Sequence, residues 1–245
     1  MEGFIERTAL KEIIRKYCDD FHSKMGFNYV AKDSIPIVWF GNVERYFKSP
    51  TKMLTIALNP SCIEFPKWGK QRFQDLTTLR REIILKEFPI DLLINNYNDY
   101  FRYNPYMHWF NYYERILNGV GCSYFDGIAE NTAIHIDMYS AIATDPTWGK
   151  LAEGQRNRIQ NTSLFKELLQ ILNPEIVFIS VNLPAFKEVI EPGESIKEWV
   201  GAFDYTNKMI LYKKDGMTIL HGRNVEGKPF RNCVLTEEIK RMLFD

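Results

Sequence analysis

The chain has 245 residues, of which 45% are hydrophobic and 25% charged, so its composition excludes an intrinsically disordered protein. The 31 basic residues balance the 31 acidic ones, so no net charge attracts the protein to nucleic acid or to an anionic membrane. Any anion-binding role must come from a local cluster. At about 150 residues per domain, this length predicts one large domain or two small ones.

The sequence opens without a basic segment followed by an apolar run, and its longest apolar stretches, such as Ile176 to Ile179, are far too short to cross a bilayer. We therefore expect a cytoplasmic protein with no membrane partner. The four cysteines show no C-x-x-C spacing, so we expect reduced thiols in packing roles and no metal or other cofactor. The sequence contains no G-x-S-x-G, Walker or G-x-G-x-x-G motif. It therefore lacks the usual nucleophile motif of the α/β-hydrolases and the usual phosphate-binding loops of nucleotide-binding proteins.

The first half of the chain predicts mainly helices. Apolar residues recur at helical spacing from about Glu6 to Lys24, which is typical of one amphipathic helix. Residues 35–40 predict a short strand or an extended arm, and residues 53–58, MLTIAL, predict a strand that ends at Asn59. Further helical patterns lie near residues 73–88, 91–101 and 109–118.

Strands and helices alternate in the second half. The expected elements are a strand over 133–138, a helix over 163–172, a strand over 175–181, a helix that begins with Asn182 and Pro184, two strands around Asp215-Gly216 within 208–222, and a helix over 236–243.

This alternation predicts an α/β fold with a mainly parallel sheet. We expect one domain over residues 36–245, preceded by a helical extension over residues 1–35. Ligands of parallel sheets bind beyond the carboxyl ends of the strands, so the residues that follow the strands are the candidate site residues. They are Asn59, Pro60 and Ser61 after the first strand, Asp137 to Ser140 after the second, Asn182 after the third, and His221 to Asn224 after the last.

The loop after the first strand combines basic and aromatic residues. They are Phe65, Lys67, Trp68, Lys70, Arg72 and Phe73, with no acidic residue within 66–72. Such interleaving suits the phosphates and stacked bases of a nucleic acid. The alternative is a plain turn begun by Asn59-Pro60, with the lysines on a solvated face.

Two histidines suggest possible chemistry. His221, where the last strand should end, would as a neutral imidazole hydrogen-bond the charge on a leaving group, and Gly222 would let the backbone approach a ligand. The alternative is a partly buried histidine in a turn. His135 and Asp137 form an H-x-D pair on one strand, which suits a metal, but no other histidine has metal-ligand spacing. We therefore expect His135 to face the helices, while Asp137 and Ser140 reach the ligand cleft.

These motifs, in this order, resemble those of the uracil-DNA glycosylase-like superfamily. Ala57-Leu58-Asn59-Pro60-Ser61 is similar to the Gly-Ile-Asn-Pro-Gly signature of its Asn-type, mismatch-specific branch, and His221-Gly222-Arg223 falls where the family has His-Pro-Ser. Residues 110–121 and 164–186 resemble the helical and helix–strand segments between the two motifs. The resemblance covers residues 37–235.

The sequence departs from the family pattern at three places. Ala57 replaces a glycine, and Gly222-Arg223 replaces the Pro-Ser of the loop that wedges into DNA. Asp137 stands where the family has a base-reading asparagine, and an ionised aspartate only accepts hydrogen bonds, which would change the base edge that is accepted. The cysteines also lack the spacing of the iron–sulfur branches, so we expect no cluster.

The resemblance implies a three-layer fold with a four-stranded, mainly parallel sheet, and hydrolysis of the N-glycosidic bond of uracil or another deaminated or damaged base after base flipping. It implies DNA as the partner, bound through the local basic and aromatic patch, with no cofactor; a monomer is our default. Asn59 would position the attacking water and His221 would stabilise the departing base. The substrate would be held by Pro60, Ser61, Asp137, Ser140, Arg223, Asn224 and Lys228, with Phe65, rather than Trp68 or Phe73, stacked on the flipped base.

An asparagine has no useful pKa, so the resemblance implies a slow enzyme that positions water, unless Asp137 or Glu64 supplies a base. Two other functions stay open. A protein of the same fold would bind nucleic acid or a nucleotide without cleaving it, as the altered second motif and zero net charge favour. A metal-dependent hydrolase would use His135 and Asp137.

Overall fold

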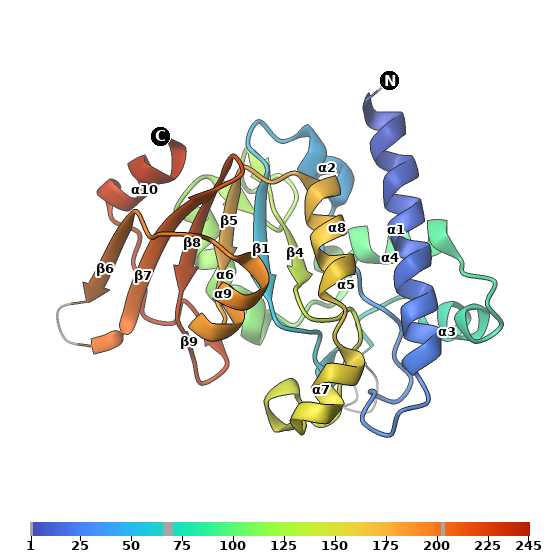
Figure 1. Ribbon diagram of the computed structural model, residues 1–245. Coiled ribbons are helices and arrows are strands. Elements are labelled where there is room, and N and C mark those ends of the chain that lie inside the picture. Colours follow the sequence, from blue (N-terminus) through green and yellow to red (C-terminus); the bar gives the residue numbers. More distant parts are fainter. Residues whose placement is uncertain (1, 66–70, 202–203) are drawn as a thin grey trace. The chain divides into compact units, whose positions relative to one another are not determined.

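The computed structural model describes residues 2–65, 71–201 and 204–245 (Figure 1). Contacts within the chain form two compact units, each assembled from three separate segments. Unit 1 comprises Met1–Gly41, Leu58–Tyr106 and Asp137–Asn173, and unit 2 comprises Asn42–Ala57, Met107–Ile136 and Pro174–Asp245. Residues 1–35 therefore all belong to unit 1.

Unit 1 is built mainly from helices. They are α1 (Glu2–Lys24), η1 (Cys62–Glu64), α3 (Leu76–Ile84), α4 (Ile90–Asn98), α5 (Tyr100–Tyr103), η3 (Trp148–Lys150), α7 (Glu153–Ile159) and α8 (Thr162–Leu172). The expected N-terminal helix is confirmed as α1, which packs against α3, α4 and α8. It buries Ile13, Ile14 and Cys18 completely, as its apolar spacing predicts.

The segment before the first strand is an extended arm. All of residues 35–40 are buried, and the Ile37 amide donates to the Ala141 carbonyl at 2.9 Å. The Ala31 amide likewise donates to the Ala143 carbonyl at 2.9 Å. These bonds satisfy buried backbone groups without making this arm a sheet strand.

Unit 2 carries a mixed sheet of six strands in the order β4-β1-β5-β8-β7-β6. The strands are β1 (Met53–Ala57), β4 (Ile134–Asp137, of which Asp137 belongs to unit 1), β5 (Ile176–Ile179), β6 (Lys197–Gly201), β7 (Asp204–Lys214) and β8 (Met217–Gly222). β1 pairs with β5 and β5 with β8 in parallel, whereas β7 runs antiparallel to β8 and β6 antiparallel to β7.

The α/β class is thus confirmed, but the prediction of a four-stranded, mainly parallel sheet is wrong: the sheet is larger and partly antiparallel. The antiparallel part consists of β7, in the expected hairpin around Asp215-Gly216, and of β6, which no sequence pattern predicts. Asp215 and Gly216 have positive φ, 50° and 81°, which matches the twist of a two-residue hairpin and folds β7 back beside β8. β6 then adds to the free edge of β7.

The helices of unit 2 are α2 (Val43–Lys48), α6 (Met107–Asn118), α9 (Leu183–Ile190) and α10 (Glu237–Phe244). Two of them, α6 and α9, cover opposite faces of this sheet. On one face, Phe110 and Tyr113 of α6 contact His135; on the other, Phe186 of α9 contacts Tyr212 and His221. In Figure 1, α9 accordingly lies in front of the strands and α6 behind them.

Short elements and caps complete the described chain. Two small sheets pair β2 (Cys122–Ser123) with β3 (Asn131–Thr132) and β9 (Asn224–Val225) with β10 (Lys228–Pro229).

The expected start of α9 is confirmed, because the Asn182 side chain accepts a hydrogen bond from the Ala185 amide and Pro184 lies in the first turn. None of the described helices combines the length and apolar character that a membrane span requires.

Candidate functional site

The predicted site residues are divided between the two units. Unit 1 holds Asn59, Pro60, Ser61, Phe65, Asp137 and Ser140, and unit 2 holds His221, Arg223 and Asn224. Each group is therefore described within its own unit.

Asn59 lies two positions after the end of β1 and is half-buried. Its side-chain nitrogen donates to the Pro60 carbonyl at 2.9 Å and to the Thr144 hydroxyl at 3.2 Å. Both hydrogens of the amide are thereby held, while no donor from the described residues bonds its oxygen. The oxygen is the group left to accept a hydrogen bond from a water.

Thr144 is a site residue that the sequence analysis missed. It is completely buried, and besides contacting Asn59 it forms an isolated parallel bridge with Ser61. Ser61 in turn caps η1, because its hydroxyl accepts from the Ile63 amide at 3.3 Å. No motif marks a threonine 85 positions after Asn59. Only the folded chain brings them together.

Glu64, at the end of η1, is a nearly completely buried carboxyl group. The Tyr100 hydroxyl donates to it at 2.6 Å, and the Arg72 Nε lies 3.6 Å away. Burial raises the pKa of Glu64 to about 7, and the charge of Asp137 adds to the rise; the Tyr100 hydrogen bond and Arg72 oppose it. A carboxyl group that titrates near neutral pH has the property of a general base.

The basic and aromatic loop differs from the expectation wherever it is described. Phe65 has no exposed surface and stacks on Phe73 with ring centroids 6.0 Å apart. Arg72 is buried beside Glu64 and donates to the Ile63 carbonyl at 3.1 Å and the Asn104 carbonyl at 2.9 Å. Both side chains therefore serve the interior of unit 1. Lys67, Trp68 and Lys70 lie outside the described residues.

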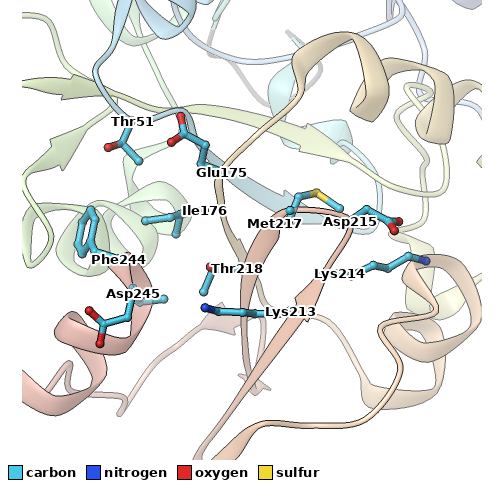
Figure 2. A pocket seen from close by; sticks show the side chains of 12 residues that line it. Thr51, Glu175, Ile176, Lys213, Lys214, Asp215, Met217, Thr218, Phe244 and Asp245 are labelled. Atoms are coloured by element: carbon cyan, nitrogen blue, oxygen red, sulfur yellow. The ribbon is translucent and has the colours of Figure 1, made fainter.

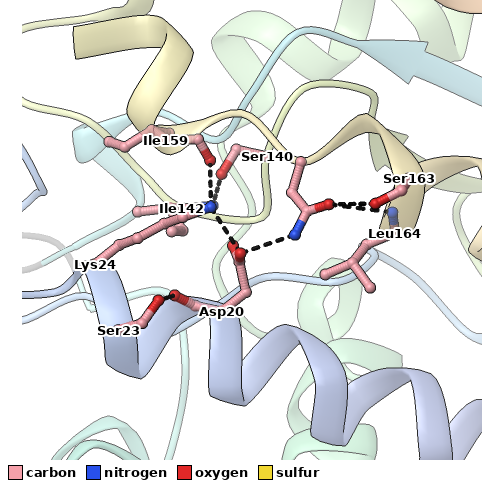
Figure 3. A network of polar contacts seen from close by, with 9 residues as sticks. Asp20, Ser23, Lys24, Ser140, Ile142, Ile159, Ser163 and Leu164 are labelled. Carbon is pink, nitrogen blue, oxygen red and sulfur yellow. Dashed lines mark hydrogen bonds and ion pairs between the residues drawn. The ribbon is translucent and has the colours of Figure 1, made fainter.

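Asp137 and Ser140 are both buried at the end of β4. The Ser140 hydroxyl accepts from the Ile142 amide at 3.0 Å, which fixes the turn after the strand. Figure 3 shows this turn beside a polar network. In that network, Lys24 donates to Asp20 at 2.6 Å, and Asn161 donates to the same carboxylate oxygen at 2.8 Å. The network joins the end of α1 to the start of α8.

His221 is buried in unit 2 at the end of β8. Its ring stacks on Phe186 with centroids 4.6 Å apart, and its Nε2 lies 2.9 Å from the Val181 carbonyl oxygen, to which it donates as a neutral ring. Burial lowers the pKa of His221 to about 4, and the charge of Lys208 contributes. The imidazole is therefore neutral at pH 7, as the sequence analysis requires of a leaving-group partner, but its N–H already has an acceptor.

We expect the His221 ring to stay neutral on acidification down to about pH 4. The unfolded chain protonates His221 near pH 6.5 and the folded chain only near 4, so the unfolded state binds more protons in this interval. The free energy of unfolding should therefore fall as the pH drops from about 6.5 to 4. Titration of the ring C–H shifts by NMR, assigned with His221→Gln, measures this; a midpoint near 6.5 would contradict the buried ring.

Gly222 is required by packing. A Cβ atom there would lie 2.1 Å from a ring carbon of Phe230, which is itself completely buried. The close approach that the sequence analysis assigned to a ligand is therefore made by a side chain of the same unit. Arg223 is exposed beyond it, and Asn224 and Lys228 are half-buried in the β9–β10 hairpin.

A metal site built on His135 gains no support. The expectation that His135 faces the helices is confirmed, because its ring contacts Trp109 and Phe110 of α6 and its Nδ1 lies 2.7 Å from the Thr55 hydroxyl. Throughout residues 2–65, 71–201 and 204–245, no three His, Cys, Asp or Glu side chains gather closely enough to hold a metal.

Unit 2 has a hollow of about 560 Å³ at the amino ends of β5 and β8. Figure 2 shows the side chains that line it. Two of its charged groups bond to the chain itself: Lys214 donates to the carbonyls of Ile190 and Glu191 at 2.7 and 3.1 Å, and Glu175 accepts from the Lys52 amide. It lies at the opposite end of these strands from Asn182 and His221. The hollow is therefore separate from the candidate residues at the carboxyl ends.

Comparisons of this chain with known protein families, with characterised proteins and with solved structures found no match.

Proposed function

We propose that the protein hydrolyses the N-glycosidic bond of a deaminated or damaged base in DNA. The observation that carries the proposal is the Asn59 amide, whose nitrogen is held by Thr144 and the Pro60 carbonyl while its oxygen is left to accept from water. Glu64, on the same loop and with a pKa of about 7, supplies the basicity that an amide lacks. The position of Asn59 beyond the carboxyl end of a strand and the order of the motifs along the chain support the same function.

The reaction balances with these groups. The oxygen of a water forms a bond to the sugar carbon as the bond from that carbon to the base nitrogen breaks, and the bonding electrons leave with the base. The water loses one proton, which Glu64 accepts, and the departing base takes up a proton from solvent. The resemblance gives His221 the role of stabilising the departing base. His221→Ala tests that role separately, because His221 belongs to unit 2.

The test is a strand-cleavage assay with oligonucleotides that carry uracil, hypoxanthine, xanthine or a G·T mismatch, followed by alkali. We expect cleavage at one lesion and a rate about a hundredfold lower for Asn59→Ala, because water positioning is lost. Asn157→Ala, on an exposed position of α7, is the matched control and should cleave normally. No cleavage of any substrate, or full activity of Asn59→Ala, would contradict the proposal.

A second candidate is a protein that binds nucleic acid without cleaving it. Two observations favour it: the N–H of His221 is engaged by Val181, and Phe65 has no free face for a base. With the same oligonucleotides, this function predicts no strand cleavage, and it predicts that a separate binding measurement detects binding to all of them. Its affinity should fall steeply with salt, because phosphate contacts release counterions.

A further inference from the structure

Unit 1 contains a second feature, a pocket of about 280 Å³ between the end of α1, the turn that follows it and Arg80 of α3. Its walls mix apolar side chains, among them Phe21, Met25 and Phe27, with the polar side chains of Asn28, Lys32, Ser34 and Arg80. None of the residues assigned to water activation lines it. The pocket is therefore independent of the proposed function.

Ser34 lines this pocket with a buried hydroxyl group. Its exposed fraction is 2%, and its Oγ has no hydrogen-bond partner in the part of the chain that the structure describes. A buried hydroxyl without a partner costs free energy, and native proteins satisfy most such groups. The pocket therefore offers a hydrogen bond that the chain itself does not use.

The rim of the pocket carries excess positive charge. Lys32 is exposed there and has no ion-pair partner among the described side chains. Arg80 pairs with Asp33, with Nη1 and Oδ1 2.9 Å apart. One of the two positive charges is thus balanced and the other is left for a ligand.

We infer that this pocket binds a small amphipathic carboxylate, in which an apolar ring or chain lies against Phe21 and Phe27 and the carboxylate accepts from Ser34 near Lys32. The size fits such a ligand. A cavity of about 150 Å³ holds a benzene molecule, so about 280 Å³ suits an aryl or alkyl acid of roughly nine to fifteen non-hydrogen atoms. Binding sites of this kind combine apolar walls with a few placed polar groups.

Binding of benzoate, 4-phenylbutyrate and octanoate to the full chain, measured by calorimetry at millimolar ligand, tests this inference. Each acid is compared with its matched alcohol. We expect saturable binding of at least one acid, about tenfold tighter than its alcohol. No saturable binding of any acid, or equal affinities for acid and alcohol, would overturn the proposal.

Two variants locate the site. Lys32→Gln and Ser34→Ala should each weaken binding of the acid about tenfold, whereas Lys150→Gln, an exposed lysine of the same unit, should not. Because the Ser34 hydroxyl has no partner among the described residues, Ser34→Ala should keep or raise the thermal midpoint of the ligand-free protein. A lowered midpoint, or unchanged affinity in both variants, would show that the hydroxyl serves the fold and not a ligand.

Discussion

Gly222→Ala is expected to lower the free energy of unfolding by about 3 kcal/mol, because the new methyl group has no space. Three ring atoms of Phe230 would lie 2.1, 2.2 and 2.8 Å from the added Cβ. Phe230 has no exposed surface and contacts both Tyr113 and Phe178, so its ring cannot turn away without disturbing these neighbours. Urea unfolding of the two proteins measures the loss.

A double-mutant cycle assigns the cause. In a Phe230→Leu background the ring is absent, so the additional cost of Gly222→Ala should be much smaller than in the natural chain. Gly154→Ala is the matched control: Gly154 lies in α7 with open space around its Cβ position, and alanine there should be neutral or stabilising by up to about 1 kcal/mol. If the cycle showed no coupling, the contact between Gly222 and Phe230 would be absent in solution.

The elements that the sequence predicts well are those with local causes. Apolar spacing determines α1, the Asn182 side chain caps α9, and the Asp215-Gly216 turn determines the hairpin of β7 and β8. β6 was missed because Lys197–Gly201 is a short, charged segment without a strand pattern of its own. It becomes a strand by pairing with β7, and such pairing partners are not encoded locally.

The residues of the candidate site divide in the same way, into those with local causes and those that depend on partners distant in the chain. The position of Asn59 after β1 could be predicted, because Asn59-Pro60 ends a clear apolar run. The properties of Glu64 could not, because its high pKa comes from burial in the folded chain, which the hydrogen bond from Tyr100, 36 positions away, only partly offsets. For Phe65, the local sequence suggests a binding role that the folded chain does not support. Its basic neighbours suggested an exposed stacking platform, but an aromatic ring fits a core equally well, and it packs on Phe73.

Glu64→Gln is expected to lower the rate of base excision about a thousandfold at pH 8, because glutamine cannot accept the proton of the attacking water. In the natural enzyme the rate should fall as the pH drops below about 7, where Glu64 becomes protonated. This fall in rate at low pH is the acid limb of the pH profile, and the variant should lack it. The measurement is the cleavage rate at single turnover between pH 5 and 9, with the substrate that the first assay identifies.

Stability should change with pH in the opposite direction to the His221 effect. The folded chain protonates Glu64 near pH 7 and the unfolded chain near 4.5, so the folded state binds more protons between these values. The free energy of unfolding attributable to Glu64 is thus fully present below about pH 4.5 and is lost as the pH rises to about 7. Glu64→Gln should remove this slope, as urea titrations at several pH values can show.

Tyr100→Phe separates a catalytic carboxylate from one that only shapes the loop. The Tyr100 hydroxyl donates to Glu64 at 2.6 Å and favours its ionised form, so removing the donor should raise the pKa of Glu64 further. If Glu64 accepts the proton in the reaction, the acid limb of the rate must move to higher pH in Tyr100→Phe and vanish in Glu64→Gln. An acid limb that stays in place in both variants would assign the base elsewhere, and Asn59 would then act through water positioning alone.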